Sequence, residues 1–249
     1  MLYLGGFADR SRQGATGDSP PDWPARFTSL AAQARDPRLR AFYTASPPAG
    51  DTPLAAVPLL ALDVETTGLD ARRDEIVSIG LVPLDLDRVR ASASRHWIVR
   101  PRRALAAESV TLHGITHSQV AAAPDLADIL DELLAALAGQ ILVVHCREIE
   151  RAFLAAALRE RIGEGLEFPV IDTMDLEARL HRGKKPGLLD RLRRRPPVSI
   201  RLAVARARYG LPRYRPHHAL TDALATAELL LAQVAHRFTP ETPLRELWR

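Results

Sequence analysis

The sequence predicts an α/β fold in which a mixed β-sheet is flanked by helices. Three apolar, strand-forming runs come first, and the short spacers between them favour antiparallel hairpins, at residues 59–65, 76–86 and 90–100. Amphipathic helices and short buried strands then alternate along the chain, at residues 125–137, 141–145, 148–159 and 219–234. Strands followed by strand–helix alternation are typical of a mixed sheet covered by helices.

The spacing of apolar residues supports the first of these helices. Leu126, Leu130 and Leu133 recur at helical spacing within residues 125–137, and Gly139 is a stop signal just beyond them. The run ILVVH that follows is apolar and short, so we expect it to be a buried strand of the sheet.

Four segments of the chain differ in composition. Residues 1–24 are rich in Gly, Ser, Pro and Asp with little apolar periodicity, so we expect them to be disordered. Residues 25–56 are predicted to form a helical N-terminal extension followed by a Pro-rich linker. The main domain is predicted to cover residues 57–238, with a C-terminal tail at residues 239–249.

Residues 25–45 place apolar side chains at helical spacing, and Asp36-Pro37 interrupts the pattern before a second short helix. A lone amphipathic segment of this length is marginal in water, so it needs a surface to cover. We expect it to pack on the main domain, and a binding site for a partner protein is the alternative. The packing residues would be Phe27, Leu30, Phe42 and Tyr43.

Length and composition exclude several classes of protein. The chain has 249 residues, 47% of them hydrophobic, which suffices for a sizeable core. No run of about eighteen apolar residues occurs, so no membrane span is predicted, and the N-terminus has too short an apolar run for a signal peptide. Cys146 is the only cysteine, which excludes an intrachain disulfide and favours a reducing, cytoplasmic setting.

The charge of the chain is unevenly distributed. The net charge is +4, yet residues 176–216 carry thirteen Arg or Lys against two acids, a local charge of +11 that leaves −7 elsewhere. An acidic body with a basic segment suits an enzyme that holds cations in one place and phosphates nearby. A solvated arginine-rich surface is the alternative interpretation.

Two carboxylates, Asp63 and Glu65, stand at the end of the first predicted strand. Side chains alternate along a strand, so both point to the same face, where they repel one another and lose hydration. A divalent cation would relieve both costs, and oxygen ligands favour magnesium or manganese over zinc. Solvated acids at a strand edge are the alternative. Thr66 and Gly68 follow, and they predict a tight turn that a substrate backbone can approach.

A second constellation, PHHALTDA, places Asp222 in the first turns of the last helix and His217 on the loop before it. A carboxylate on a firm helix can hold a metal, and an imidazole on a loop can exchange protons near neutral pH. On its own, the segment is more typical of a helix entry in which an acid favours the helix dipole.

The segment ILVVHCREIERAFL carries two acids, Glu148 and Glu150, at the start of a helix that follows a strand. Taken alone, it is typical of a surface helix with solvated glutamates. Its significance comes from its position between the two constellations described above.

Together, DVETTGL, VVHCREIERAFL and HHALTDALATAELL resemble the three signature blocks of the DEDD exonuclease superfamily, in its histidine sub-branch. The similarity spans roughly residues 57–236 and is strongest to the branch of the proofreading epsilon subunit of bacterial DNA polymerase III. It implies a ribonuclease H-like fold and a metal-dependent 3′→5′ exonuclease that releases nucleoside 5′-monophosphates. DNA is the expected substrate.

The resemblance also implies roles for individual residues. Four carboxylates of that family hold two divalent cations, Mg or Mn, and a histidine serves as general base. The general base corresponds to His217 here, and the four acids correspond to Asp63, Glu65, Glu150 and Asp222.

The middle block departs from the family pattern His-Asn-x-x-Phe-Asp. Glu150 stands at the usual Asp, Cys146 at the usual Asn and Ile149 at the usual Phe. Because glutamate has one more methylene than aspartate, its oxygens must fold back to reach the same cation, and Mg²⁺ demands near-ideal octahedral geometry. We therefore expect a weaker second metal site and a preference for manganese.

The resemblance further implies contacts with nucleic acid that has a free, single-stranded 3′ end. The terminal nucleotides would contact Thr66, Thr67, Gly68, Leu69 and His113. A histidine at a helix entry is an equal alternative for His113. The basic run at residues 182–197 is the candidate track for the strand. An RNA-directed exonuclease of the oligoribonuclease or RNase T kind is the alternative enzyme, and a module that binds nucleic acid with weak or no cleavage is the alternative outside catalysis.

Overall fold

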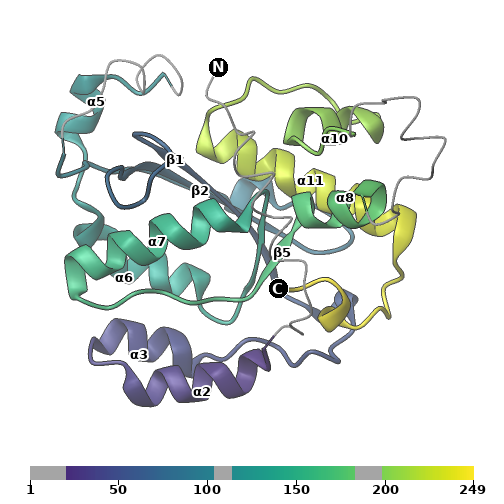
Figure 1. Ribbon diagram of the computed structural model, residues 1–249, viewed down its shortest axis with the longest axis horizontal. Coiled ribbons are helices and arrows are strands. Elements are labelled where there is room, and N and C mark those ends of the chain that lie inside the picture. The colour runs from purple at the N-terminus through teal and green to yellow at the C-terminus, as the bar shows by residue number, and fades with distance from the viewer. Residues whose placement is uncertain (1–20, 104–113, 183–197) are drawn as a thin grey trace.

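A five-stranded mixed sheet forms the centre of the computed structural model, which describes residues 21–103, 114–182 and 198–249 (Figure 1). The strand order is β3-β2-β1-β4-β5. The strands are β1 Leu59–Thr66, β2 Ile76–Leu84, β3 Arg95–Ile98, β4 Ile141–Val144 and β5 Val170–Asp172. The predicted mixed α/β sheet flanked by helices is confirmed.

The first three strands form the predicted antiparallel hairpins, and β4 and β5 then run parallel to β1. The third strand is shorter than the predicted residues 90–100, because Ala91–Ala93 form a 3₁₀ turn, η2, before it. The carboxyl ends of β1, β4 and β5 therefore lie at one edge of the sheet, where Glu65 and Thr66 end the central strand.

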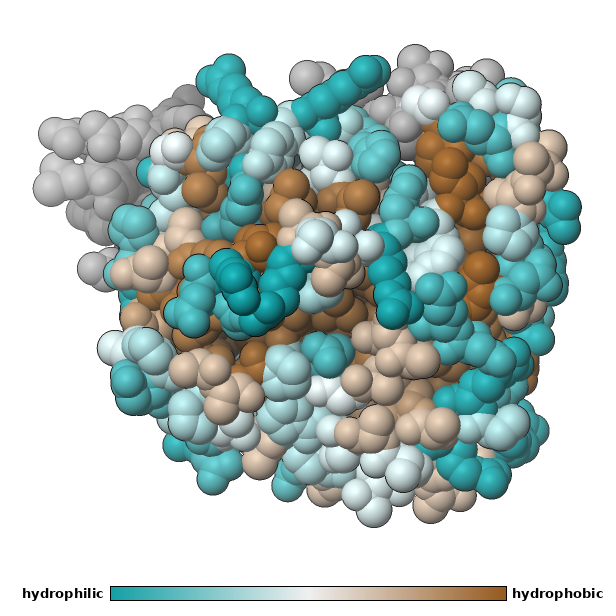
Figure 2. Space-filling model, turned by 180° about the vertical axis from the view of Figure 1, so that it is seen from behind, coloured by the Kyte–Doolittle hydropathy of each residue, from teal (hydrophilic) through white to brown (hydrophobic). Residues whose placement is uncertain are grey.

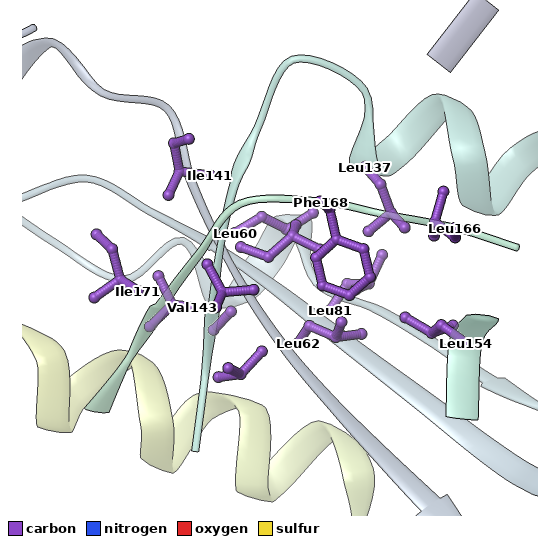
Figure 3. Packing of buried hydrophobic residues seen from close by; sticks show 14 of the residues in the cluster. Leu60, Leu62, Leu81, Leu137, Ile141, Val143, Leu154, Leu166, Phe168 and Ile171 are labelled. Atoms are coloured by element: carbon purple, nitrogen blue, oxygen red, sulfur yellow. The ribbon is translucent and has the colours of Figure 1, made fainter. Parts of the chain in front are cut away.

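Helices cover both faces of the sheet. α11, Ala219–Arg237, packs on β1 and β2, and α7, Arg147–Ile162, contacts the same two strands. Side chains that alternate along the strands separate the two faces. Figure 3 shows Leu62 of β1 and Leu81 of β2 beside Phe168 and Leu154. Because Asp63 follows Leu62 in the strand, its side chain points to the opposite face.

Shorter elements connect this framework. α6, Leu126–Leu137, precedes β4 and packs beside α7. Buried leucines of α6 join the main core, as predicted from their helical spacing. The remaining elements are η1 Leu54–Ala56, α5 His117–Ala122, α8 Thr173–Arg182, α10 Leu202–Arg208 and η3 Leu244–Glu246.

The N-terminal helices, α2 Trp23–Gln33 and α3 Pro37–Thr44, pack against each other as a hairpin. The hairpin lies below α6 and α7 in Figure 1. Asp22 and Asp36 cap their first turns by accepting backbone N–H groups. The first helix begins two residues before the predicted start at residue 25, because Asp22 and the Pro that follows Trp23 favour a helix start there. Residues 1–20 lie outside the described part of the chain.

Aromatic side chains hold this hairpin to the main core. Phe27, Phe42 and Tyr43 are buried and lie 5.1 to 5.4 Å apart between ring centroids. Leu30 is partly buried against the same cluster. The expected packing of residues 25–45 on the core is found. The division of the chain into an extension and a main domain stays a prediction, since one hydrophobic cluster runs through both.

The C-terminal residues differ from the tail predicted at residues 239–249. Leu244, Leu247 and Trp248 are buried in the core, and Trp248 pairs with Ile171 of β5. The sequence does not predict this packing, because the three apolar residues after the polar segment PETP are too few to show a helical or strand period.

The surface has little exposed apolar area among large side chains. Of the described large hydrophobic residues, Val198 and Val204 are exposed, at 42% and 43%. On the face opposite to that of Figure 1, hydrophilic side chains predominate and strongly hydrophobic ones show in recesses of the upper half (Figure 2). No helix in the described ranges is long and apolar enough to cross a membrane.

Candidate active site

Three carboxylates converge at the carboxyl end of β1. Asp63 and Glu65 of the strand and Asp222 of α11 each offer one oxygen, and these oxygens lie within 4.8 Å of one another. Asp63 and Asp222 are partly exposed, and Glu65 is buried. The predicted same-face arrangement of Asp63 and Glu65 is found, and the helix brings Asp222 to it from 157 positions further along the chain.

Burial raises the pKa values of these acids, and repulsion from neighbouring carboxylates adds to the rise for Asp63 and Glu65. Burial raises the pKa of Glu65 to about 8, with Asp222 adding to the effect. Burial also raises the pKa of Asp63 well above its usual range, and the charges of Glu65, Asp222 and Glu150 add to it. The pKa of Asp222 is raised by burial and lowered by the backbone N–H groups of His217 and His218. A cluster of this kind gains by taking up a cation, which replaces the protons.

A glycine lets α11 approach the sheet at this point. Gly80 of β2 pairs with Asp63 of β1. A Cβ on Gly80 would lie 2.4 Å from the carbonyl carbon of Ala219 and 2.5 Å from the nitrogen of Leu220. The first residues of the helix thus rest directly on the backbone of the strand that lies next to Asp63. A glycine within an apolar strand is the sequence signal for such an approach, and the sequence interpretation missed it.

His217 lies on the loop directly before α11, and its side chain is exposed. Its backbone N–H donates to Asp222 Oδ2 at 2.7 Å. The residue has a φ of 67°, in the left-handed region that a non-glycine residue adopts at a conformational cost. This backbone places the predicted general base and a predicted metal ligand in direct contact.

Glu150 lies on the first turn of α7 and is 3% exposed. Its Oε2 has no hydrogen-bond partner within the described parts of the chain. Burial raises its pKa well above the usual range, and the charges of Asp172 and Glu148 add to the effect. Its own charge raises the pKa of Asp63, so it lies near the three converging carboxylates although it is not one of that group.

Two other acids near Glu150, Asp172 and Glu148, could be considered as metal ligands in its place, but both have partners. Asp172, at the end of β5, accepts backbone N–H groups of Cys146, Arg147, Met174 and Asp175 and thereby caps the starts of both α7 and α8. Glu148 is paired with Arg147 at 3.3 Å. A buried carboxylate oxygen without a donor is costly unless something else satisfies it. Of Glu148, Glu150 and Asp172, it is Glu150 that keeps such an oxygen among the described residues.

Cys146 and Ile149 occupy the other two positions that depart from the family pattern. Cys146 is buried with a φ of 116°, and burial raises the pKa of its thiol above the usual range, with further effects from Glu150 and Asp172. Ile149 is partly buried against the core. With Cys146 and Ile149 at these positions, Glu150 still lies near the converging carboxylates.

The turn after β1 contains the predicted substrate contacts Thr66, Thr67, Gly68 and Leu69, which are partly exposed. Asp74 holds this turn closed. Its carboxylate accepts the Thr67 hydroxyl at 3.3 Å and the Asp70 N–H at 2.9 Å, and a Cβ on Gly68 would lie 2.4 Å from it. The sequence interpretation missed Asp74, because a polar loop residue four positions from its partner gives no periodic signal.

Two further predictions fall on parts of the chain that are not described. His113, the candidate contact for the penultimate nucleotide, lies outside the described residues. The basic run at residues 182–197 does so too, except for its first residue.

The side chains present fit a divalent cation. The converging donors are carboxylate oxygens, which hard cations such as magnesium and manganese prefer, and no thiol or imidazole lies among the three. Glu150 is not one of these three, and its Oε2 has no hydrogen-bond partner among the described residues.

Comparison with known proteins identifies relatives of the chain. Residues 60–230 match a family model described as exonuclease. A DNA polymerase III subunit epsilon-like protein of Rhodobacter capsulatus is 33% identical over 182 residues, which is 73% of this chain and 24% of that protein. DNA polymerase III subunit epsilon of Treponema pallidum is 28% identical over 180 residues, 72% of this chain and 78% of that protein. The chain spans about a quarter or less of the first relatives it matches.

Solved structures share the fold. Exonuclease X in complex with 5′ overhanging duplex DNA has a TM-score of 0.56 and 23% identity, over 75% of this chain and 97% of that one. The nuclease domain of 3′hExo, a DEDDh family member bound to rAMP, has a TM-score of 0.58 and 17% identity, over 72% and 92% of the two chains.

Proposed function

This chain belongs to the exonuclease family, and from that premise we propose that it removes nucleoside 5′-monophosphates one at a time from the 3′ end of DNA. The observation that carries the proposal is the convergence of Asp63, Glu65 and Asp222 beside the unpartnered oxygen of Glu150. Solvated surface acids would not be buried as Glu65 and Glu150 are, and would not leave the Oε2 of Glu150 without a partner among the described residues.

We assign the four acids to the binding of two divalent cations, magnesium or manganese. When bound, the cations supply Lewis acidity at the scissile phosphate and the leaving 3′ oxygen. Asp63 and Glu65 are fixed by the sheet, and Asp222 is fixed by a helix that rests on Gly80, so three ligands are held by rigid elements. Glu150 has one more torsion than an aspartate, which weakens its share of the binding.

His217 acts as the general base and takes the proton of the attacking water. Its loop position gives the imidazole room to move, and its backbone bond to Asp222 keeps it beside the carboxylates. Removal of such an acid–base group lowers the rate about 10²- to 10⁴-fold.

The closed turn after β1 receives the terminal nucleotide. Gly68 carries no side chain and so leaves room for the Asp74 carboxylate that closes the turn, and the backbone of residues 66–69 is proposed to contact the nucleotide. We propose a single strand with a free 3′ end as the form of nucleic acid that is cut. The epsilon and epsilon-like relatives support DNA as substrate.

RNA is the second candidate substrate. A structural neighbour carries rAMP, and another is described by its 3′-end specific recognition of a histone mRNA stem-loop.

We propose that the reaction takes place in the cytoplasm. Cys146 is buried and free, and a free cysteine suits a reducing compartment.

Digestion of matched single-stranded DNA and RNA oligomers tests the proposal. Each is labelled at its 5′ end in one set and at its 3′ end in another, with magnesium, manganese or EDTA. We expect a ladder that shortens from the 3′ end, release of labelled mononucleotide, faster cutting of DNA, and no cutting in EDTA. Equal cutting of RNA would favour the RNA-directed alternative, and tight binding without products would favour a binding module.

A further inference from the structure

Two anchors hold the loop that carries His217. The first anchor is Arg206 of α10, which is buried beside α11 (Figure 1). Its guanidinium donates to the carbonyl of Pro212 at 3.0 Å, to Glu228 at 2.7 Å and lies 4.7 Å from the ring centroid of Tyr214. The Tyr214 hydroxyl also donates to Glu228. Residues 212–214 are therefore fixed to α10 and α11.

The second anchor is His218, the residue after the proposed base. It caps α11 by accepting the Thr221 N–H at 3.4 Å through Nδ1. Its ring stacks on that of His96 from β3, with centroids 4.8 Å apart and planes inclined by 34°. His96 in turn shares a hydrogen bond of 2.8 Å with the hydroxyl of Ser78, a fully buried residue of β2. A continuous contact path thus leads from the sheet to the loop.

Three residues lie between the two anchors, Arg215, Pro216 and His217, all of them exposed. Because this segment is short and held at both ends, the position of His218 constrains the position of His217. The left-handed backbone of His217 requires such support, because a non-glycine residue leaves that conformation when its surroundings allow it. His96 and His218 are both exposed, so their ring contact lies at the surface of the molecule.

We infer that His96 is a positioning residue, which holds the loop of the proposed base in place through its stack on His218. The inference rests on the role proposed above for His217. Without the His96 ring, His218 loses its support on the sheet and His217 spends less time beside Asp222. The turnover rate kcat then falls about three- to tenfold, the range that one aromatic contact controls. KM for the oligomer changes little, because His96 is separated from the proposed substrate turn by the width of β2.

Three substitutions distinguish the contribution of the His96 ring from that of its hydrogen bond to Ser78. His96→Ala removes both, His96→Asn keeps a polar group and removes the ring, and His96→Phe keeps a ring that can stack. We expect kcat to fall for Ala and Asn and to stay near the parent value for Phe. His236→Ala is the matched control, since His236 contacts the Tyr209 ring edge-to-face, with centroids 5.2 Å apart, near the far end of α11, and we expect it to leave kcat unchanged.

A double-mutant cycle with His217→Ala decides the question, measured as single-turnover rates on a 5′-labelled oligomer with excess enzyme. If His96 acts through His217, then His96→Ala has no further effect in the His217→Ala background. The inference would be overturned if His96→Ala lowered the rate equally in both backgrounds, or did not lower it in the parent. The effect of His217→Ala itself would be unaffected by either result. A His217→Ala protein that cuts as fast as the parent would instead overturn the proposed function of His217. Circular dichroism melts confirm that each variant is folded.

Discussion

Gly80 of β2 and Ala219 of α11 are in backbone contact, and this contact sets the distance between the two halves of the active site. Gly80 pairs with Asp63, and Ala219 lies one helical turn before Asp222. A Cβ on Gly80 would meet the carbonyl carbon of Ala219 at 2.4 Å, which real structures do not tolerate. The sheet and the helix thus bring their carboxylates together at a point where neither carries a bulky side chain.

Gly80→Ala should therefore push the start of α11 away from the sheet. We expect a loss of about 1–3 kcal/mol in the free energy of unfolding, as for other overpacked sites. We also expect weaker binding of manganese, because Asp222 moves away from Asp63. Chemical denaturation and calorimetric titration with manganese measure the two effects.

Gly165→Ala is the control for this change. Its Cβ would meet the end of the Arg159 side chain, at 3.1 Å, and that side chain can move. Equal effects of the two substitutions on manganese binding would contradict the role assigned to Gly80.

Glu150 and Glu148 should respond differently to the same substitution. Glu150→Gln removes an unpartnered buried carboxylate beside the other acids, so we expect cleavage to be abolished. Glu148→Gln removes a partly exposed carboxylate that is paired with Arg147, so we expect nearly parental rates. Glu150→Asp should keep or raise the rate with magnesium, because the shorter side chain suits octahedral geometry. Rates on a labelled oligomer with each metal provide the measurement.

Glu150→Gln activity equal to that of the parent would remove this residue from the site. Asp172 would then be the next acid to examine, although its four backbone N–H donors give it a structural role. For Asp172→Asn we expect a lower melting temperature, since half of its accepting capacity is replaced by a donor group that faces other donors.

Stability without metal should fall as the pH rises from about 5 to about 8. The pKa of Glu65 is raised from 4.5 to about 8, so the folded protein holds this proton more tightly than the unfolded chain does. The resulting stabilisation is complete below pH 4.5 and is lost as the pH approaches 8. The raised pKa values of Asp63, Glu150 and Asp222 act in the same direction.

Melting temperatures in EDTA and in manganese across this pH range check the sign. We expect the gain from manganese to grow with pH, because the cation binds the deprotonated acids. Glu65→Gln should flatten the slope in EDTA. A melting temperature in EDTA that rises from pH 5 to pH 8, in a protein shown to be folded, would contradict the proposed burial of these acids.

Phe27→Ala should destabilise the protein and leave the chemistry intact. Phe27 is 2% exposed and contacts the rings of Trp23, Phe42 and Tyr43 within the N-terminal hairpin. Truncation of a buried Phe costs about 3–5 kcal/mol. We expect a lower melting temperature with unchanged kcat at a temperature where the variant is folded. An unchanged melting temperature would favour the alternative in which residues 25–45 serve a partner protein.

Local patterns predicted the parts of this protein that depend on neighbours in sequence. Alternation along one strand sufficed to place Asp63 and Glu65 on one face, and helical spacing sufficed for the buried leucines of α6. The order of three motifs predicted that Asp222 would join them.

The parts that were missed depend on contacts between distant segments. His96 and His218 are 122 positions apart, and Asp172 caps a helix that begins 25 positions earlier, so neither relationship leaves a periodic trace. The C-terminal Trp248 joins the core only because β5 ends beside it. Such contacts follow from the assembled sheet and not from any window of sequence.

The most direct test of the account compares the parent with Asp222→Asn on a 5′-labelled single-stranded DNA oligomer in manganese. The substitution keeps the size of the side chain and removes the charge that the cations need. We predict a ladder shortening from the 3′ end for the parent and an uncut oligomer for the variant, with both proteins folded by circular dichroism. A folded Asp222→Asn protein that produces the same ladder at the same rate would contradict the assignment of catalysis to this cluster of acids.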